Sequence, residues 1–259
     1  MKILFGAFYK SIAIIVFILI WEVICRLGLF HKMLIPSFSD VTIKTWEMFQ
    51  SGYLTEHLLT SLFRASLGLI VAVIVAIPLG FLLGGWFKYV NLTLDSLFEV
   101  LSQTNPFILF HIIIIFLGIG ELPKVFIITW ACIWPIMFNT VHGVKNINPI
   151  IIKTGRGFGL NRVKLFWKIV LPSISPSIFT GIRISAGYSL FMLIAAEMMG
   201  ASKGLGWLIA ASEENYDVLT IFSAVLVIAF IGLTFDEILR LIQKKFFIRT
   251  REDILNSEY

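Results

Sequence analysis

Long apolar stretches constrain this chain more than any other feature of its sequence. A helix needs roughly 20 apolar residues to cross the hydrocarbon of a bilayer. Six stretches reach that length, at about residues 11–29, 62–86, 97–118, 122–141, 172–199 and 218–241. Because 58% of the residues are hydrophobic and 14% are charged, lipid must surround most of the chain. The sequence therefore predicts an all-α membrane protein with six transmembrane helices.

The distribution of lysine and arginine predicts the orientation of these helices. Cations concentrate in the cytoplasmic loops of membrane proteins. If both termini are cytoplasmic, most lysines and arginines fall on the inner side, above all those of the loop 142–171. We therefore expect cytoplasmic N and C termini. The net charge of +5 then reflects membrane topology, and it does not indicate binding to nucleic acid.

The chain divides into three parts. Residues 1–60 are expected to form an uncleaved first transmembrane helix and an external amphipathic segment, whose helix begins near Pro36–Val41. Residues 61–250 are expected to form the main transmembrane domain, with the cytoplasmic loop at 142–171. Residues 251–259 are a polar tail. Cys25 and Cys132 lie in or beside apolar stretches without a metal-binding spacing, so we expect them to pack inertly.

Small residues recur at every fourth position in two of the predicted spans. One series is Gly68, Ala72, Ala76, Gly80 and Gly84, and the other is Ser173, Ser177, Gly181, Ser185 and Ser189. Such a series gives a helix a smooth face that another helix can approach closely. The seam is either static or one along which helices slide between two states. In the second case, Ser185 and Ser189 are candidates for lining a translocation path.

Two charged residues of the 172–199 span are further candidates for the path. Arg183 lies near the middle of the bilayer, where a cation costs at least about 2.5–3.5 kcal/mol, so it must face the bundle interior. It either pairs with a carboxylate such as Glu22 or attracts an anionic substrate. Glu197 lies near the outer end of the same helix. It is either a solvated acid at the interface or part of the path.

A glycine-rich segment follows this span directly. Residues 200–209 read Gly-Ala-Ser-Lys-Gly-Leu-Gly-Trp-Leu-Ile. Glycines allow a tight turn, so the segment is either a plain turn or a packed element that re-enters the bundle. In the second case Gly200, Gly204, Gly206 and Trp207 are candidates for an outer gate.

The cytoplasmic loop at 142–171 alternates cations with apolar residues. This pattern predicts two short helices joined by a turn at Gly159, with Pro172 in the first turn of the following span. A basic loop resting on anionic lipid is one interpretation. The spacing from Gly159 over nine residues to Ile169-Val-Leu171-Pro172 favours a docking element for another protein.

Two motifs of common enzymes are missing from the sequence. There is no GxxxxGK[ST], the phosphate-binding loop of many ATPases, and no HExxH. The chain is therefore not expected to be an enzyme or to hold a cofactor or metal of its own.

Gly159–Pro172 resembles the "EAA" loop of ABC importer permeases. Four further segments resemble permeases of the nitrate, sulfonate and taurine type: Leu34–Val41, His57–Gly68, Phe116–Lys124 and Ala196–Ile209. The resemblance covers residues 34–245 and implies a plasma-membrane subunit of the type I importer fold. It also implies two copies of the permease and two ATPase subunits that bind ATP-Mg. An external binding protein would deliver a sulfonate, taurine, nitrate or thiamine-precursor-like vitamin.

The resemblance also names the docking residues. They are Lys153, Thr154, Gly155, Phe158, Gly159, Ile169, Leu171 and Pro172. Where the family has Glu-Ala-Ala, this chain has Lys153-Thr154-Gly155, in which a cation replaces a carboxylate and a glycine weakens the first short helix. This departure predicts a partner with a matching surface. The alternative function is a self-sufficient secondary transporter or channel.

Overall fold

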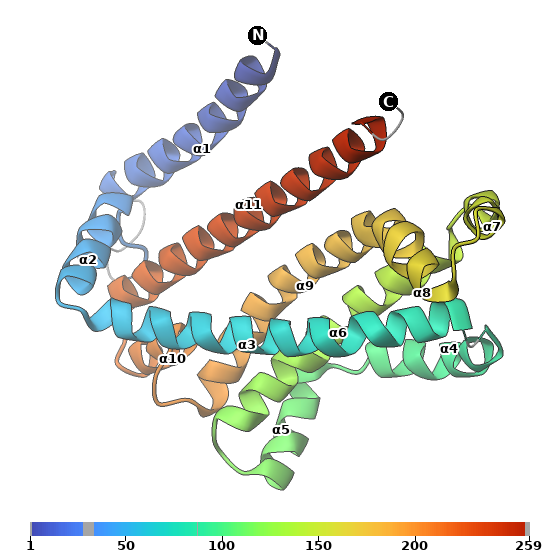
Figure 1. Cartoon of the computed structure of the whole chain (residues 1–259). Helices are drawn as coiled ribbons and strands as arrows, with labels where there is room; N and C mark the ends of the chain where they lie inside the picture. The colour runs from blue at the N-terminus through green and yellow to red at the C-terminus, as the bar shows by residue number, and fades with distance from the viewer. Residues whose placement is uncertain (1, 28–33, 87, 257–259) are drawn as a thin grey trace.

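The computed structural model describes residues 2–27, 34–86 and 88–256, and all regular secondary structure in these ranges is helical. The elements are α1 (Lys2–Arg26), α2 (Phe38–Gln50), α3 (Tyr53–Phe81), η1 (Leu82–Trp86), α4 (Lys88–Ser102), α5 (Pro106–Leu117), α6 (Glu121–Lys145), α7 (Pro149–Gly157), α8 (Arg162–Leu165), η2 (Phe166–Val170), α9 (Leu171–Gly200), α10 (Leu205–Glu214) and α11 (Val218–Asn256). The segments η1 and η2 are π-helical. Figure 1 shows α3, α6, α9 and α11 as long rods, with α7 and α8 at one end of the bundle and α10 at the other.

Within the described residues, four helical stretches are long and apolar enough to cross a bilayer. They are Tyr53–Gly85, Glu121–Lys145, Arg162–Gly200 and Val218–Lys244. Each contains one of the predicted spans in full or nearly so. The predicted first span at 11–29 coincides with α1 as far as Arg26, and its last two residues lie outside the described ranges.

The predicted span over residues 97–118 is broken into two helices. This stretch is divided between α4 and α5, and Ser96–Ser102 and Pro106–Leu117 meet at an angle of 86°. The break follows from local chemistry, because Asn105 accepts a hydrogen bond from the Phe107 N–H at 2.9 Å and caps a new helix. Pro106 occupies the first turn of that helix, where its missing N–H leaves no bond unmade.

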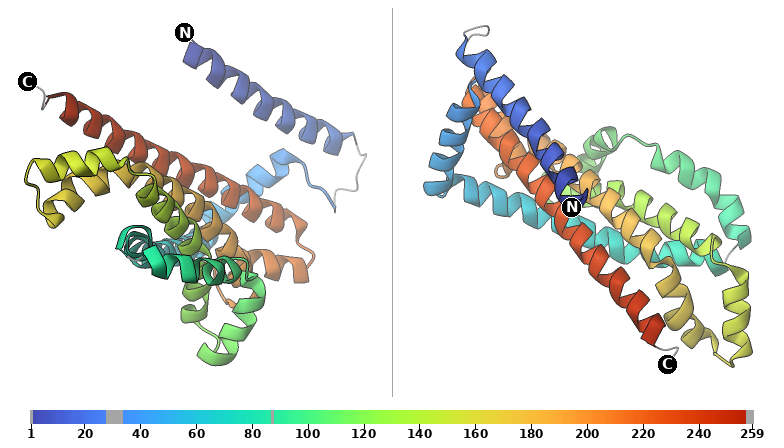
Figure 2. Two further views of the ribbon diagram at one scale, coloured as in Figure 1. Left: turned by 90° about the vertical axis from the view of Figure 1, so that its right-hand side faces the viewer. Right: turned by 90° about the horizontal axis from the view of Figure 1, so that it is seen from above.

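The amphipathic segment forms the helix α2, as the sequence indicates. Ser37 caps it by accepting a hydrogen bond from the Asp40 N–H at 3.2 Å. The helix α1 stands apart from the rest of the bundle along most of its length (Figures 1 and 2). Near its C-terminal end, Trp21 contacts Phe38 of α2 and Phe222 of α11, with ring centroids 5.5 and 5.9 Å apart.

The helix α6 is the centre of the bundle, and its most extensive contacts are with α9 and α3. The glycine and alanine series of α3 faces α6. A Cβ at Gly68 would lie 2.5 Å from Cγ2 of Ile128, and one at Gly80 would lie 2.5 Å from Cβ of Thr140. Both distances are far below van der Waals contact, so α3 and α6 approach this closely only because glycine stands at these positions.

The serine and glycine series of α9 faces the other side of α6. A Cβ at Gly181 would lie 2.9 Å from the backbone atoms Cα of Ile136 and O of Pro135. Ser185 Oγ donates to the Cys132 carbonyl at 2.8 Å, and Cys132 Sγ contacts the Ser185 carbonyl at 3.3 Å. The two predicted series thus pack against one common helix, and Cys132 has the packing role expected for it.

Pro172 lies in the first turn of α9, as predicted. Helical structure also precedes α9, because α8, η2 and α9 together form one stretch of 39 residues, Arg162–Gly200. Proline lacks the N–H that an α-helix uses for its bond to the carbonyl four residues earlier. The π-helical segment η2 directly precedes α9. At the junction, the Leu171 N–H donates to the Phe166 carbonyl, five residues back.

A matched pair of glycines on α9 tests the close packing against α6. Gly181→Ala places a methyl group against the α6 backbone and is expected to cost about 1–3 kcal/mol of stability. Gly187 has no atom within 4 Å of an added Cβ, so Gly187→Ala is expected to leave stability unchanged or raise it by up to about 1 kcal/mol. Thermal unfolding of the purified chain in detergent compares the two. Equal unfolding temperatures would contradict the proposed close contact.

Candidate functional site

The residues predicted to dock a partner form a helical hairpin at one end of the bundle. We call residues 149–165 the docking segment. Asn148 caps α7 by accepting from the Ile150 N–H at 2.9 Å, and Asn161 caps α8 by accepting from the Lys164 N–H at 2.8 Å. Between these helices Gly159 has a φ of +74°, a left-handed conformation that favours glycine. The predicted pair of helices with a turn at Gly159 is confirmed.

Gly155 allows α7 to lie close to the following helix. A Cβ at this position would lie 2.5 Å from Cδ1 of Ile169 and 2.8 Å from Cδ1 of Leu165. The glycine that departs from the family pattern is thus buried against the base of the docking segment. Lys153 and Thr154, beside it, are exposed.

Large apolar side chains of the docking segment point away from the bundle. Phe158 is 82% exposed, Ile150 67% and Val163 66%. Ile169 and Leu171 are half-buried beneath them. An exposed apolar patch rimmed by cations, at the polar end of a membrane protein, marks a contact surface for another protein.

An ion-pair network occupies the opposite end of the bundle. Arg64 of α3 is 4% exposed and binds Glu121 of α6 through two bonds, Nε to Oε2 at 2.5 Å and Nη2 to Oε1 at 2.7 Å. Its Nη1 donates to Glu197 Oε1 of α9 at 2.7 Å and to the Lys203 carbonyl at 2.6 Å. Lys124 binds Glu121 at 3.0 Å. We call Ser61, Arg64, Glu121, Lys124 and Glu197 the Arg64 cluster.

Glu197 is fully buried in this cluster, at 0% exposure. Its carboxylate accepts from Arg64, from Ser61 Oγ at 2.8 and 2.9 Å, and from the Gly206 N–H at 2.9 Å. The expectation of a solvated acid at the interface is therefore wrong. Its contacts in the described chain are internal, and they hold α3, α9 and the start of α10 together.

The glycines at the start of α10 allow this arrangement. A Cβ at Gly204 would lie 2.3 Å from the Glu197 carboxylate, and one at Gly206 would lie 2.4 Å from the Ile194 carbonyl oxygen. Trp207 stacks on His57 of α3, with ring centroids 5.2 Å apart. Gly200 lies near Phe110 and Ile114 of α5. The segment is thus packed into the bundle, and its role as a gate stays a prediction.

Arg183 pairs with Asp236 of α11. Its Nε and Nη2 donate to the two carboxylate oxygens at 2.5 and 2.8 Å. The predicted partner Glu22 instead contacts Arg26 and Ser39. Both members of the Arg183–Asp236 pair are nearly half exposed, with side-chain exposures of 43% and 47%.

Ser185 and Ser189 do not face the same way as Arg183. Both are 0% exposed, and their hydroxyls donate to the Cys132 and Ala186 carbonyls. In this conformation they belong to the seam between α9 and α6. The structure therefore separates the path candidates into buried packing residues and one accessible charged pair.

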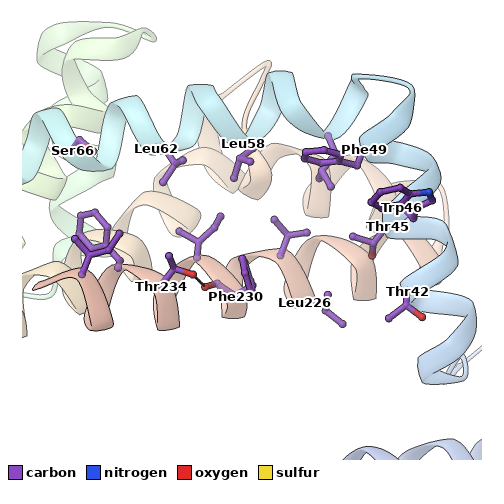
Figure 3. Close-up of a pocket in the computed structure, with 15 residues that line it drawn as sticks. Thr42, Thr45, Trp46, Phe49, Leu58, Leu62, Ser66, Leu226, Phe230 and Thr234 are labelled. Atoms are coloured by element: carbon purple, nitrogen blue, oxygen red, sulfur yellow. Dashed lines mark hydrogen bonds between the residues drawn. The ribbon is translucent and has the colours of Figure 1, made fainter. Parts of the chain in front are cut away.

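An apolar groove of about 710 Å³ lies between α3 and α11, with α2 at one end (Figure 3). Four hydroxyl groups line it, from Thr42, Thr45, Ser66 and Thr234, and each of the three threonines donates to a carbonyl of its own helix. The remaining lining is almost entirely aliphatic and aromatic. The groove therefore suits hydrocarbon, and it is a poor site for a polar solute.

Residues 76–251 match the family described as "Binding-protein-dependent transport system inner membrane component". A putative ABC transporter permease protein of Methanocaldococcus jannaschii is 33% identical over 238 residues, which is 89% of this chain and 88% of that protein. The bicarbonate transport system permease protein of Synechocystis is 34% identical, over 88% of this chain and 84% of its own length. The taurine transport system permease protein of Escherichia coli is 29% identical, over 89% of this chain and 85% of its own length.

A solved chain of the MetNI methionine ABC transporter, in an inward-facing conformation, shares the fold. The TM-score is 0.68 at 16% identity, over 74% of this chain and 95% of that chain. The chain therefore belongs to the binding-protein-dependent transport family of inner-membrane components. It is a transmembrane permease subunit of an ABC importer, of the nitrate, sulfonate and taurine type, and a multi-pass plasma-membrane protein. Permeases of this family are not themselves enzymes, and they work with ATPase and binding-protein partners.

Removing one charge from the Arg64 cluster tests its structural role. Glu197→Ala leaves Ser61, the Gly206 N–H and one Arg64 donor without their acceptor, and is expected to cost about 3–5 kcal/mol of stability. The control is Glu56→Ala, since Glu56 pairs with Lys203 on the surface and is 55% exposed. This variant is expected to change stability little. Unfolding of both variants in mixed detergent micelles, titrated with a denaturing detergent, is the measurement, and similar losses would contradict the assignment.

Proposed function

We propose that two copies of this chain form the path of an importer for a small anion. In this arrangement both termini and the docking segment face the cytoplasm, and α1 and the α4–α5 pair complete six membrane crossings. Each docking segment contacts one of two ATPase subunits. An external binding protein delivers the anion to the end of the bundle that holds the Arg64 cluster.

The exposed apolar patch of the docking segment carries this proposal. Phe158, Ile150 and Val163 lie at the end of the bundle with the greatest excess of cations, which is the cytoplasmic end by the positive-inside rule. An apolar patch at that position needs a protein partner to cover it. A hairpin with a left-handed glycine at its tip presents the patch in one fixed geometry.

The proposed mechanism couples ATP binding to the long helices. Closure of the two ATPases moves the docking segment, and α8 continues without a break through η2 into α9. A displacement of the segment thus tilts α9 against its small-residue seam with α6. ATP can favour the outward-open state only if the ATPases bind ATP more tightly in that state than in the inward-open state.

The relatives support a small anion as the substrate. Curated relatives are named for aliphatic sulfonates, taurine and bicarbonate. Arg183 of α9 is partly accessible in this structure, and Asp236 neutralises its charge. An arriving sulfonate or carboxylate has the geometry to replace Asp236 on the guanidinium.

Two neighbouring glycines test the docking geometry. Gly159→Ala forces an alanine into the left-handed region, at a cost of about 1–2 kcal/mol, and is expected to weaken ATPase binding about tenfold. Gly157→Ala lies within α7, where an added Cβ meets no atom within 4 Å, and is expected to leave binding unchanged. Co-purification of the ATPase from the native membrane, with uptake into vesicles, measures both.

The same experiment separates the importer from a secondary transporter. Uptake that continues without ATP, by a chain that purifies without any ATPase, would overturn the proposal. Equal co-purification for the two alanine variants would exclude the docking role of the Gly159 turn.

A charge-removal series tests Arg183 as a substrate contact. Asp236→Asn leaves the guanidinium unpaired and is expected to lower the unfolding temperature. The double variant Arg183→Gln/Asp236→Asn is expected to recover stability while losing most uptake of whichever anion the wild type carries, among taurine, an alkanesulfonate, nitrate and bicarbonate. Normal uptake by the stable double variant would show that Arg183 is purely structural.

A further inference from the structure

We propose that a cavity between the docking segment and the bundle binds the phosphate headgroup of an anionic phospholipid from the adjoining leaflet. The proposal rests on the cytoplasmic orientation given above. It adds a lipid that holds the docking segment against the membrane helices. The site is separate from the apolar groove between α3 and α11.

The cavity has a volume of about 800 Å³ and walls of two kinds. One wall is apolar and comes from the membrane helices, with Phe81 at the end of α3, Leu83 in η1 and Phe166 at the start of η2. The rings of Phe81 and Phe166 meet edge to face, 4.8 Å apart. Phe81 and Leu83 lie on a membrane-spanning stretch, so this wall lies where that stretch meets the membrane surface.

The other wall is cationic. Lys145, Arg156 and Arg162 line it, and no aspartate or glutamate is among the described residues that line the cavity. All three cations are exposed, and none has an ion pair with another residue of the described ranges. The sequence contains no acid between Glu121 and Glu197, so neighbouring residues along the chain supply no counter-charge. An anion from outside the chain is needed to balance this wall.

The combination of walls favours a lipid over a soluble anion. Guanidinium groups bind phosphate oxygens through paired hydrogen bonds, so Arg156 and Arg162 suit a phosphate headgroup. Free phosphate would leave the apolar wall uncovered, whereas a phospholipid covers it with the start of its acyl chains. Basic pockets between membrane helices on the cytoplasmic side are typical sites for anionic headgroups.

The lipid would not compete with the ATPase. In an α-helix, residues four apart share a face, and positions two apart lie on nearly opposite faces. Ile152 and Arg156 line the cavity, whereas Ile150 and Thr154 lie on the opposite, exposed face of α7, and Phe158, the residue that follows α7, is also exposed. One face of α7 thus meets the lipid and the other meets the ATPase. The bound lipid would fix the angle at which α7 presents Phe158.

Native mass spectrometry of the purified permease alone tests the site. We expect the wild type to retain phosphatidylglycerol at least about tenfold more than phosphatidylcholine when both are supplied in equal amounts. Arg156→Gln/Arg162→Gln is expected to remove this preference, and Arg156→Lys/Arg162→Lys to restore most of it. Lys164→Gln/Lys168→Gln is the matched control, because it removes the same charge from exposed positions outside the cavity and should keep the preference.

Three results would overturn the proposal. The first is a wild type without any preference for phosphatidylglycerol. The second is an equal loss of this preference in Arg156→Gln/Arg162→Gln and in the control Lys164→Gln/Lys168→Gln, which indicates general surface charge. The third is displacement of the lipid by millimolar inorganic phosphate or glycerol phosphate, which indicates a site for a soluble anion. ATPase co-purification is measured separately, so loss of docking with intact lipid retention would count against the proposed function alone.

Discussion

Close backbone approach along α6 is the constraint on which the rest of this structure depends. In lipid there is no hydrophobic force to drive helices together, so packing and hydrogen bonds must do so. Glycines of α3 and α9 bring both helices within contact of α6, and Ser185 bonds across one of the seams. The Arg64 cluster and the docking segment lie at opposite ends of these same helices. Each is positioned by the same pair of seams.

The Arg64 cluster shows how a polar group is tolerated in such an interior. Glu197 has no access to solvent, yet its carboxylate receives a guanidinium, a hydroxyl and a backbone N–H. A buried charge is stable only when its partners are this complete. The glycines before and within α10 leave room for this carboxylate, because any side chain at Gly204 would occupy its space.

Sequence reasoning predicted the long helices, both small-residue seams and the hairpin at Gly159, because these depend on local composition and spacing. It predicted residues 97–118 as one span but did not predict the 86° bend before Pro106, where an asparagine cap and a proline start a new helix. It also missed the Arg64 cluster, whose members come from three separate segments, His57–Gly68, Phe116–Lys124 and Ala196–Ile209. Each segment was recognisable as a motif, but periodicity within one helix cannot show that their charges converge. The available signal was the presence of charged residues inside each of these three motifs.

The pairing of charges inside the spans has a consequence for membrane voltage. In the described chain, Arg64 and Lys124 are balanced by Glu121 and Glu197, and Arg183 is balanced by Asp236. A membrane potential acts on net charge, with about 2.3 kcal/mol per elementary charge per 100 mV. Helices that tilt with these pairs intact carry no net charge through the field. The potential across the membrane therefore finds no net charge on these paired side chains when the helices tilt.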